Sequence, residues 1–461
     1  MNPYQKDILI YLKSLKSRIN GLGSLKKLVG EKGIQHLTQN QWHVLDQQFL
    51  IARRKFLSVV SQILQVAKTK DYSQEERRKM YHRLGNIEME LAKTYGFFDT
   101  YLDILSQRTT TELGSILSGI DVIAESAIRV DIPRLKKIVR PLVYCDRGFG
   151  ASILREGVPF PDGSQNPMPL IQIPYSRITV KYLLTSVIHE AGHQTLTRLG
   201  MKNKMAQEFY NAIKKRSGSE RLARLYANWS TEICPDYWSW CLTGYAQTAG
   251  LKEVLTLPPS RVLKLGNLDP HPPPYLRTLL SLSWTESAFG KKAIFERWRK
   301  EWLNTYLIQS VEESKKELFE EAIRFFPIIN DLLFNKKWKG LGNKSFTEIF
   351  PLDQVSLSNL KRIGNLIKNS KINNKKLNPT QVIAAHRYLI DHDEVNHDHI
   401  NQIITSWIKS LNRKSNKTYK SWQQQKEQVA LKNHRQKELF LPVVRPHKAT
   451  MAVDRAVNLI N

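Results

Sequence analysis

Cysteines and long apolar runs are scarce in this sequence. Only three of its 461 residues are cysteine: Cys145, Cys234 and Cys241. So few thiols exclude a disulfide scaffold and a four-cysteine zinc site, and they are typical of a reducing compartment. No apolar run reaches the roughly 18 residues that a transmembrane helix needs, and the N-terminus lacks the apolar core of a signal peptide. We therefore expect a cytoplasmic protein without a transmembrane segment, although a leaderless secreted or injected effector would have the same features.

Acidic residues are few relative to basic ones. The chain has 42 Asp and Glu residues against 70 Lys and Arg residues, which gives a net charge of +28. This charge indicates a polyanionic partner, such as nucleic acid, an anionic membrane surface or an acidic protein, or else a merely solvated basic surface. Cationic side chains are dense in one C-terminal segment: Arg413, Lys414, Lys417, Lys420, Lys426, Lys432, Arg435 and Lys437. We predict that this basic C-terminal region docks a polyanion and has no part in catalysis.

The length and the hydrophobic content indicate a folded protein of several domains. A chain of 461 residues is longer than one compact core usually holds, and a hydrophobic content of 41% is too high for a disordered chain. We predict an α+β protein with three parts. These are an N-terminal helical hairpin or bundle over 1–130, a central domain over 131–310 and a basic helical region over 311–461.

The N-terminal part carries the pattern of paired long helices. One apolar seam alternates steps of three and four residues: Trp42, Leu45, Phe49, Ala52, Phe56, Val59, Ile63 and Val66. That spacing predicts a long helix with one apolar face. Ser73 and Glu76 have the spacing of a capping box, which should start a second helix that pairs with the first as an antiparallel hairpin. We expect packing or oligomerisation in this part, and no chemistry.

The central part begins with short strands and turns. Residues 138–145 and 170–174 are rich in β-formers, and the segment between them is rich in glycine and proline. This texture predicts a small sheet with tight turns. A helix should follow from about Thr179 to Leu199, with Gly200 as its C-terminal stop.

This predicted helix carries the strongest chemical signal in the chain, the motif His189-Glu190-Ala191-Gly192-His193. Two histidines four residues apart lie on one face of a helix, where neutral imidazoles can share one zinc ion. Glu190 would stand beside them and could take a proton from a metal-bound water. The alternative is a pair of ordinary histidines with satisfied hydrogen bonds.

An acidic pair further along the chain could complete the site. Glu232 and Asp236 are also four residues apart, and their flanks are too apolar for an ordinary solvated face. Glu232 could be the third zinc ligand and leave a fourth position open for water. Asp236 could accept the N–H of a zinc-bound histidine and so fix its tautomer. Pro235 is compatible with a helix only if the helix starts or kinks there.

A proline-rich segment supplies further candidates. His271 lies in a turn that contains four prolines, and Tyr275 and Arg277 follow it. A histidine in a rigid turn and an arginine shortly after it could donate to a developing oxyanion. They could equally belong to a stiff surface connection. If Glu232 points away from the imidazoles, His271 is the next candidate for the third ligand.

Together, these three elements resemble the gluzincin clan of zinc metallopeptidases. The order of a metal helix, an acidic helix and a histidine-proline segment that ends in arginine is closest to the HtpX-like endopeptidases. The resemblance covers the central part only. It implies a zincin-like catalytic domain that binds zinc through His189, His193 and Glu232, with Glu190 as the general base. The membrane helices of many such enzymes are missing, which excludes a membrane-embedded prenyl-protein protease.

The expected function is hydrolysis of a protein or peptide substrate by a zinc-bound water. Glu190 would act as the base, and His271, Tyr275 or Arg277 would stabilise the oxyanion. The alternative is a polyanion-binding, nucleic-acid-binding or assembly protein with an inactive or structural metal site. The histidine-rich segment 386–399 could hold a second metal ion, but it better fits a polar turn that caps two helices.

Overall fold

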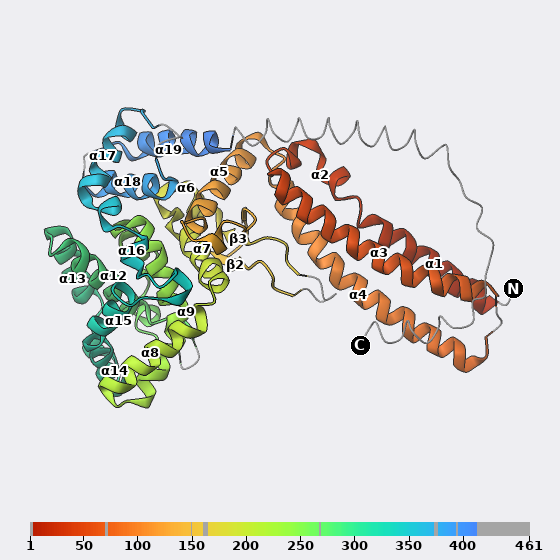
Figure 1. Ribbon diagram of the computed structural model, residues 1–461, viewed down its shortest axis with the longest axis horizontal. Coiled ribbons are helices and arrows are strands. Elements are labelled where there is room, and N and C mark those ends of the chain that lie inside the picture. Colours follow the sequence, from red (N-terminus) through yellow and green to blue (C-terminus); the bar gives the residue numbers. More distant parts are fainter. Residues whose placement is uncertain are drawn as a thin grey trace. The chain divides into compact units, whose positions relative to one another are not determined.

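The structure is a computed structural model that describes residues 3–69, 72–148, 150–159, 165–266, 269–372, 377–392 and 395–412. These residues form two compact units (Figure 1). The first contains Met1–Gly114 and Gly157–Pro167, and the second contains Ser115–Glu156 and Met168–Asn412. The predicted boundaries near residues 130 and 310 do not coincide with this division, because the described helices on both sides of residue 310 belong to the second unit.

The first unit is a bundle of long helices. Its helices are α1 (Pro3–Gly21), α2 (Leu25–Ile34), α3 (Gln39–Thr69) and α4 (Gln74–Ser106). The ring of Phe49 on α3 packs edge-on against Phe98 and Tyr101 on α4, at centroid distances of 5.3 and 6.1 Å. Ser73 and Glu76 cap the start of α4 reciprocally, which confirms the predicted capping box. Figure 1 shows α1 running alongside this pair, so the predicted hairpin is part of a larger bundle.

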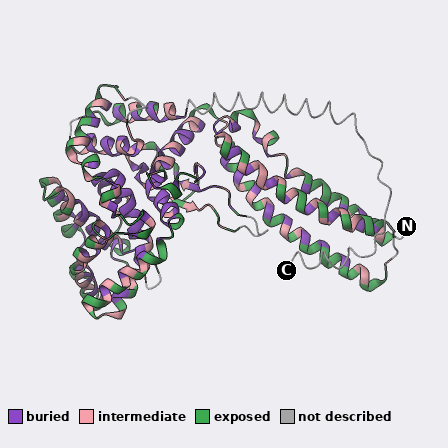
Figure 2. Ribbon diagram, in the orientation of Figure 1, coloured by how far each residue is buried: buried purple, intermediate pink, exposed green. Residues whose placement is uncertain are grey.

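Helix α3 has a buried face and an exposed face (Figure 2), and its buried positions depart from the predicted seam along the helix. The seam is buried from Trp42 to Phe56, and the buried positions then shift by one residue to Val60 and Ala67. Three predicted seam positions are half-buried or exposed: Val59, Ile63 and Val66. An α-helix drifts by about 20° per heptad relative to a strict seven-residue repeat. A straight helix therefore cannot keep one heptad stripe buried along its full length.

The second unit is mainly helical and contains one small sheet, which confirms the α+β class (Figure 1). Its elements in chain order are α5 (Thr111–Ile128), η1 (Pro133–Leu135), β1 (Leu142–Cys145), β2 (Ser152–Leu154), β3 (Leu170–Ile173), α6 (Tyr175–Thr179), η2 (Lys181–Leu184), α7 (Thr185–Arg198), α8 (Lys202–Ser217), α9 (Glu220–Thr243), α10 (Tyr245–Leu255), α11 (Pro259–Val262), α12 (Pro274–Phe289), α13 (Ala293–Thr305), η3 (Ile308–Ser310), α14 (Glu313–Arg324), α15 (Phe326–Phe334), η4 (Lys339–Leu341), α16 (Phe346–Ile349), η5 (Leu352–Val355), α17 (Leu357–Lys368), α18 (Pro379–His392) and α19 (His397–Leu411).

The sheet has the strand order β1-β3-β2. β1 pairs with β3 in parallel, with Leu142 opposite Leu170, and β2 pairs with β3 antiparallel. β1 and β3 confirm the two predicted strands, although β1 starts at Leu142 and not at residue 138. β2 was not predicted, because a strand of three residues is too short to show an alternating pattern. The sheet leads the chain directly into α6 and then α7, as the sequence predicted for the order of elements.

Helix α7 begins later than predicted. Residues 175–184 form the short helix α6 and the 3-10 turn η2, and α7 starts at Thr185 and not near Thr179. Val180 has extended backbone angles, φ −115° and ψ 106°, which separate α6 from η2. The C-terminal stop is confirmed, because Gly200 follows α7 with a positive φ of 64°.

Helices α7 and α9 approach each other closely at Gly192. A Cβ atom at this position would lie 3.1 Å from Cα and 3.2 Å from the carbonyl oxygen of Pro235. Pro235 lies inside α9, so the helix does not start there; it continues through the proline from Glu220 to Thr243. The contact between glycine and proline therefore sets the distance between the two helices that supply the candidate ligands.

We expect Gly192→Ala to destabilise the second unit by roughly 1–3 kcal/mol, because the added methyl group meets backbone atoms that cannot move aside cheaply. Gly85→Ala on α4 is the matched control, since no atom lies within 4 Å of its Cβ position. The better helix propensity of alanine should stabilise α4 by about 0.5–1 kcal/mol. Thermal unfolding of both variants measures the difference. An unchanged or raised melting temperature for Gly192→Ala would contradict the close packing.

The sequence also led us to expect no disulfide scaffold and no transmembrane helix. None of the three cysteines, all of which lie in the described ranges, forms a disulfide. Within the described ranges, no helix combines the length and the apolar character that crossing a bilayer requires.

The histidine-rich segment contains the end of α18 and the start of α19, where the Asn396 side chain accepts a hydrogen bond from the backbone N–H of His399. The basic segment 413–438 lies outside the described residues, so its docking role stays a prediction.

Candidate metal centre

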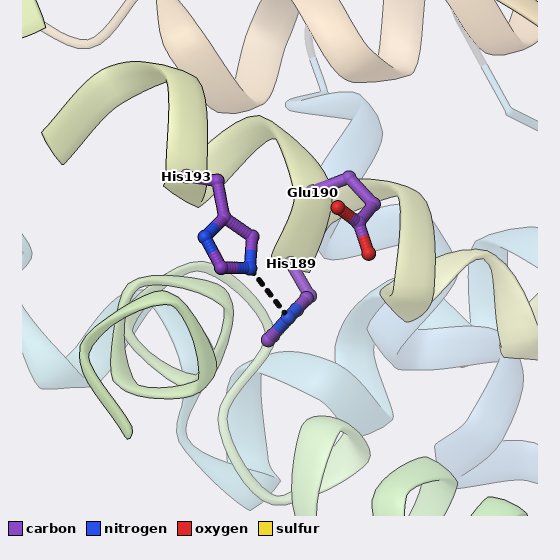
Figure 3. Close-up of side chains that lie close together, drawn as sticks. All are labelled: His189, Glu190 and His193. Carbon is purple, nitrogen blue, oxygen red and sulfur yellow. Dashed lines mark hydrogen bonds between the residues drawn. The ribbon is translucent and has the colours of Figure 1, made fainter. Parts of the chain in front are cut away.

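Helix α7 presents two imidazoles and a carboxylate from neighbouring positions (Figure 3). His189 and His193 are one helical turn apart, and their Nε2 atoms lie 3.2 Å from each other. Glu190 belongs to the same cluster, and the ligand atoms of the three residues all lie within 4.8 Å of one another. The spacing in the sequence therefore predicted correctly that one helix brings two imidazole nitrogens together.

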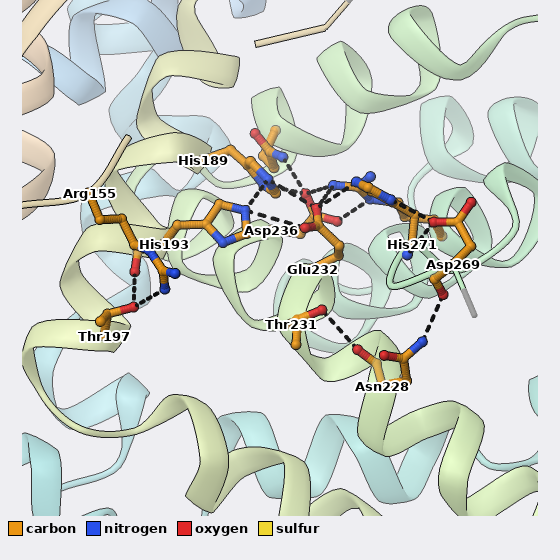
Figure 4. A network of polar contacts seen from close by, with 12 residues as sticks. Arg155, His189, His193, Thr197, Asn228, Thr231, Glu232, Asp236, Asp269 and His271 are labelled. Atoms are coloured by element: carbon orange, nitrogen blue, oxygen red, sulfur yellow. Dashed lines mark hydrogen bonds and ion pairs between the residues drawn. The ribbon is translucent and has the colours of Figure 1, made fainter. Parts of the chain in front are cut away.

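Helix α9 brings the third candidate ligand to these imidazoles (Figure 4). Glu232 Oε2 lies 3.4 Å from His189 Nε2, and Glu232 Oε1 lies 3.5 Å from His193 Nε2. Zinc bonds of about 2.0–2.1 Å at tetrahedral angles would place the ligand atoms about 3.3–3.4 Å apart. The separations of 3.2, 3.4 and 3.5 Å are close to this value, although Glu232 presents a different oxygen to each imidazole. The residue types and their proximity therefore fit a zinc ion.

Asp236 and Arg277 contact the candidate ligands His189 and Glu232 and support their positions. The sequence predicted that Asp236 accepts a hydrogen bond from a histidine of the site. Asp236 Oδ1 lies 2.8 Å from His189 Nδ1, but the two atoms do not have hydrogen-bond geometry. The Arg277 guanidinium donates from Nε to Asp236 Oδ2 at 2.5 Å and from Nη2 to Oδ1 at 3.0 Å. Nη2 also donates to Glu232 Oε2 at 3.3 Å. One largely buried arginine thus orients both acidic residues of α9, and through Asp236 it also orients the ring of His189.

With both imidazoles neutral, as zinc ligands must be, the centre has an excess of negative charge. Three buried carboxylates, those of Glu190, Glu232 and Asp236, share the field of one guanidinium, that of Arg277. Buried charges are costly unless an opposite charge compensates them. The arrangement therefore favours a bound cation.

Burial and the charge excess also shift the pKa values of these residues. Burial lowers the pKa of His189, but Asp236 and Glu232 outweigh this effect and raise the pKa to about 10. Burial and the neighbouring His189 lower the pKa of His193 to about 3. Burial raises the pKa of Glu190 to about 7. Protons on His189 and Glu190 offset part of the negative charge, and a bound cation would take over that role.

The carboxylate of Glu190 stands apart from this network. The residue is only 7% exposed, and within the described part of the chain no hydrogen bond or ion pair engages its carboxylate. Buried carboxylates normally have such partners. A general base needs its oxygen free to accept a proton from water or substrate, so the isolation of Glu190 suits that role.

His271 reaches the centre from the turn before α12. Its Nε2 lies 3.5 Å from Glu232 Oε2, and its side chain is 52% exposed, so a substrate can reach it. Asp269 Oδ1 accepts a hydrogen bond from the backbone N–H of His271 and lies 2.8 Å from its Nδ1. The structure thus brings His271 to the candidate centre, whereas the sequence also allowed a stiff surface connection. Asp269 was missed as a site residue, and its only signal was its place two positions before the histidine.

Tyr275 and Arg277 do not have the predicted oxyanion role. Helix α12 begins at Pro274, and residues two positions apart on a helix point about 200° apart around its axis. Arg277 faces α9, where both acidic residues engage its guanidinium. Tyr275 is buried, and its ring stacks on Phe319 of α14 at a centroid distance of 5.6 Å. Of the three candidates, only His271 is free to contact a substrate oxygen.

Comparison with known proteins adds no relative. No protein-family model matches the chain, and neither a curated protein nor a solved structure matches it. The functional argument therefore rests on the geometry of the site.

We expect Asp236→Asn to weaken zinc binding by roughly 10- to 100-fold, because the amide keeps the shape but loses the charge that orients His189. Breaking the buried pair with Arg277 should also destabilise the fold by about 3–5 kcal/mol. Chelator competition and thermal unfolding measure the two effects. Asp353→Asn, at an exposed position, is the control and should change neither quantity. Equal zinc affinity of Asp236→Asn and the wild type would refute the supporting role of Asp236.

Proposed function

We propose that this chain is a zinc-dependent peptidase with a zincin-like catalytic domain in its second unit. One observation carries the proposal: two imidazoles and the Glu232 carboxylate lie within 3.5 Å of one another, beside the buried Glu190 carboxylate, which has no polar partner among the described residues. Structural zinc sites use four protein ligands and need no adjacent base, whereas catalytic sites use three and leave a position for water. The arrangement therefore supports hydrolysis and not a purely structural metal.

The types of ligand favour zinc over magnesium, calcium or manganese. Those ions prefer oxygen ligands, whereas His189 and His193 offer imidazole nitrogens. Imidazole and carboxylate ligands are also those that catalytic zinc sites use.

The residues around the ligands would divide the work of peptide hydrolysis. A bound zinc ion would supply a Lewis acid that lowers the pKa of a water molecule and polarises the peptide carbonyl. Glu190 would take a proton from the attacking water and pass it to the leaving amine nitrogen. As an imidazolium, His271 would donate from Nε2 to the carbonyl oxygen as negative charge develops there, while its Nδ1 donates to Asp269. The ion pair of Asp236 and Arg277 would keep the ligands in place without touching the substrate.

Removal and return of the metal tests this function. The purified chain is incubated with an unbiased peptide pool as isolated, after treatment with a chelator and after addition of zinc, and mass spectrometry identifies the products. We expect cleavage to disappear with the metal and to return when about one zinc ion is bound per chain. Cleavage that survives complete metal removal would contradict the proposal. A metal-free chain that binds RNA, DNA or anionic vesicles in a salt-sensitive way would favour the alternative that the net charge of +28 suggests.

A further inference from the structure

An open pocket lies beside His193, on the side of the metal centre away from His271. It is a shallow hollow, open to solvent, between α7, the start of α8, and α9. Figure 4 shows Arg155 and Thr197 on one side of the His193 imidazole, and His271 with Asp269 on the other side of Glu232. A peptide that crosses the centre would therefore place one neighbouring residue in this pocket.

Part of the pocket surface is apolar. Leu196 of α7 and the neighbouring Cys234 and Pro235 of α9 line it. The Cys234 side chain is buried and behaves as a small hydrophobic group. This surface can pack against the methylene groups of a side chain.

The hydroxyl groups that line the pocket already donate to their own helices. Thr197 donates to the carbonyl oxygen of His193 at 2.8 Å. Ser230 and Thr231 donate to carbonyl oxygens one turn earlier on α9, at 2.6 and 2.8 Å. These hydroxyls therefore have no proton left for a ligand, and donors must come from other lining residues.

Two cationic side chains supply those donors. Arg155 is tethered to the pocket wall, because its Nη1 donates to Thr197 Oγ1 at 2.9 Å. Lys202 is an exposed lining residue and the first residue of α8, a helix of 16 residues. First-turn N–H groups have no acceptor within their helix, so the helix terminus adds partial positive charge near Lys202. No carboxylate is among the lining residues.

We propose that this pocket is a substrate subsite that binds a carboxylate next to the scissile bond. The inference rests on the proposed peptidase function and adds the class of substrate. The apolar surface would hold the aliphatic part of the residue, and Arg155 and Lys202 would bind its carboxylate. The carboxylate could come from an acidic side chain or from the C-terminus of the substrate, and both sources have the same chemistry.

Two matched pairs of short peptide hydroxamates test the subsite on the zinc-loaded full chain, because a hydroxamate anchors each probe on the metal without any cleavage. In the first pair, glutamate or glutamine occupies the adjacent position and the C-terminus is amidated. In the second pair, the glutamine probe has a free or an amidated C-terminus. Titration calorimetry should show about 10- to 100-fold tighter binding of the charged member in one of the pairs, as expected for a charge-assisted hydrogen bond. The pair that responds identifies the source of the carboxylate.

Variants that remove one positive charge test whether the preference for the charged probe depends on the pocket. We expect Arg155→Gln and Lys202→Gln each to reduce the preference for the charged probe several-fold, while the uncharged probe and the zinc content stay unchanged. Lys204→Gln is the control, since Lys204 is equally exposed on α8 but does not line the pocket. Equal binding of charged and uncharged probes to the zinc-loaded chain would overturn the subsite alone. A chain that binds neither zinc nor any hydroxamate would overturn the subsite together with the proposed function.

Discussion

Replacement of Glu190 by glutamine is expected to lower kcat by roughly 10²- to 10⁴-fold, which is the usual contribution of a general base. The amide keeps nearly the same shape but cannot accept a proton from the attacking water. Glu190 forms no ion pair or hydrogen bond within the described residues, so its neutralisation breaks no existing contact and should leave the fold intact. The zinc content should also stay at the wild-type level, because Glu190 is not one of the proposed ligands.

Steady-state kinetics on a peptide that the wild type cleaves measures the fall in kcat. Metal analysis of the same sample measures the zinc content. Glu296→Gln, at an exposed position on α13, is the matched control and should behave like the wild type. Wild-type turnover by Glu190→Gln would remove Glu190 as the base. Loss of zinc from this variant would instead identify Glu190 as a ligand.

Replacement of Glu232 by alanine should, in contrast, weaken zinc binding itself. We expect zinc affinity to fall by more than the 10- to 100-fold that is typical for loss of a supporting partner, because a direct ligand is removed. Activity at limiting zinc should fall with it, and excess zinc should restore activity in part. The change also leaves Arg277 paired with Asp236, so the arginine keeps its buried counter-charge.

Chelator competition on Glu232→Ala and Glu190→Gln in parallel separates the two roles. The proposal predicts weak zinc binding for the first variant and wild-type binding for the second. Wild-type affinity in Glu232→Ala would exclude Glu232 as the third ligand. In that case His271 is the next candidate, because its Nε2 lies 3.5 Å from the Glu232 carboxylate.

The parts of the site that were predicted correctly depend on spacing within one helix. His189 and His193, and likewise Glu232 and Asp236, are four residues apart, and this separation alone fixes a shared face wherever the segment is helical. The capping box at Ser73 and the glycine stop at Gly200 are local signals of the same kind. Such features need no knowledge of the tertiary fold.

The parts that were missed depend on contacts between elements. The sequence does not show that α12 turns Arg277 toward α9 and Tyr275 toward α14, because that orientation depends on how three helices pack. It also gives no sign that Arg155, after a three-residue strand, reaches Thr197 on α7. The shift of the buried positions on α3 away from the predicted seam has a different origin. It follows from the geometry of a straight helix and does not depend on contacts with other helices.

The most direct test of the central claim is to locate the metal ion itself. Crystals of the protein purified with zinc would be measured on both sides of the zinc absorption edge, so that an anomalous difference map marks the ion. The proposal predicts one strong peak in the second unit, at bonding distance from Nε2 of His189, Nε2 of His193 and a carboxylate oxygen of Glu232. A peak elsewhere, or no peak between these three side chains in fully zinc-loaded protein, would contradict it.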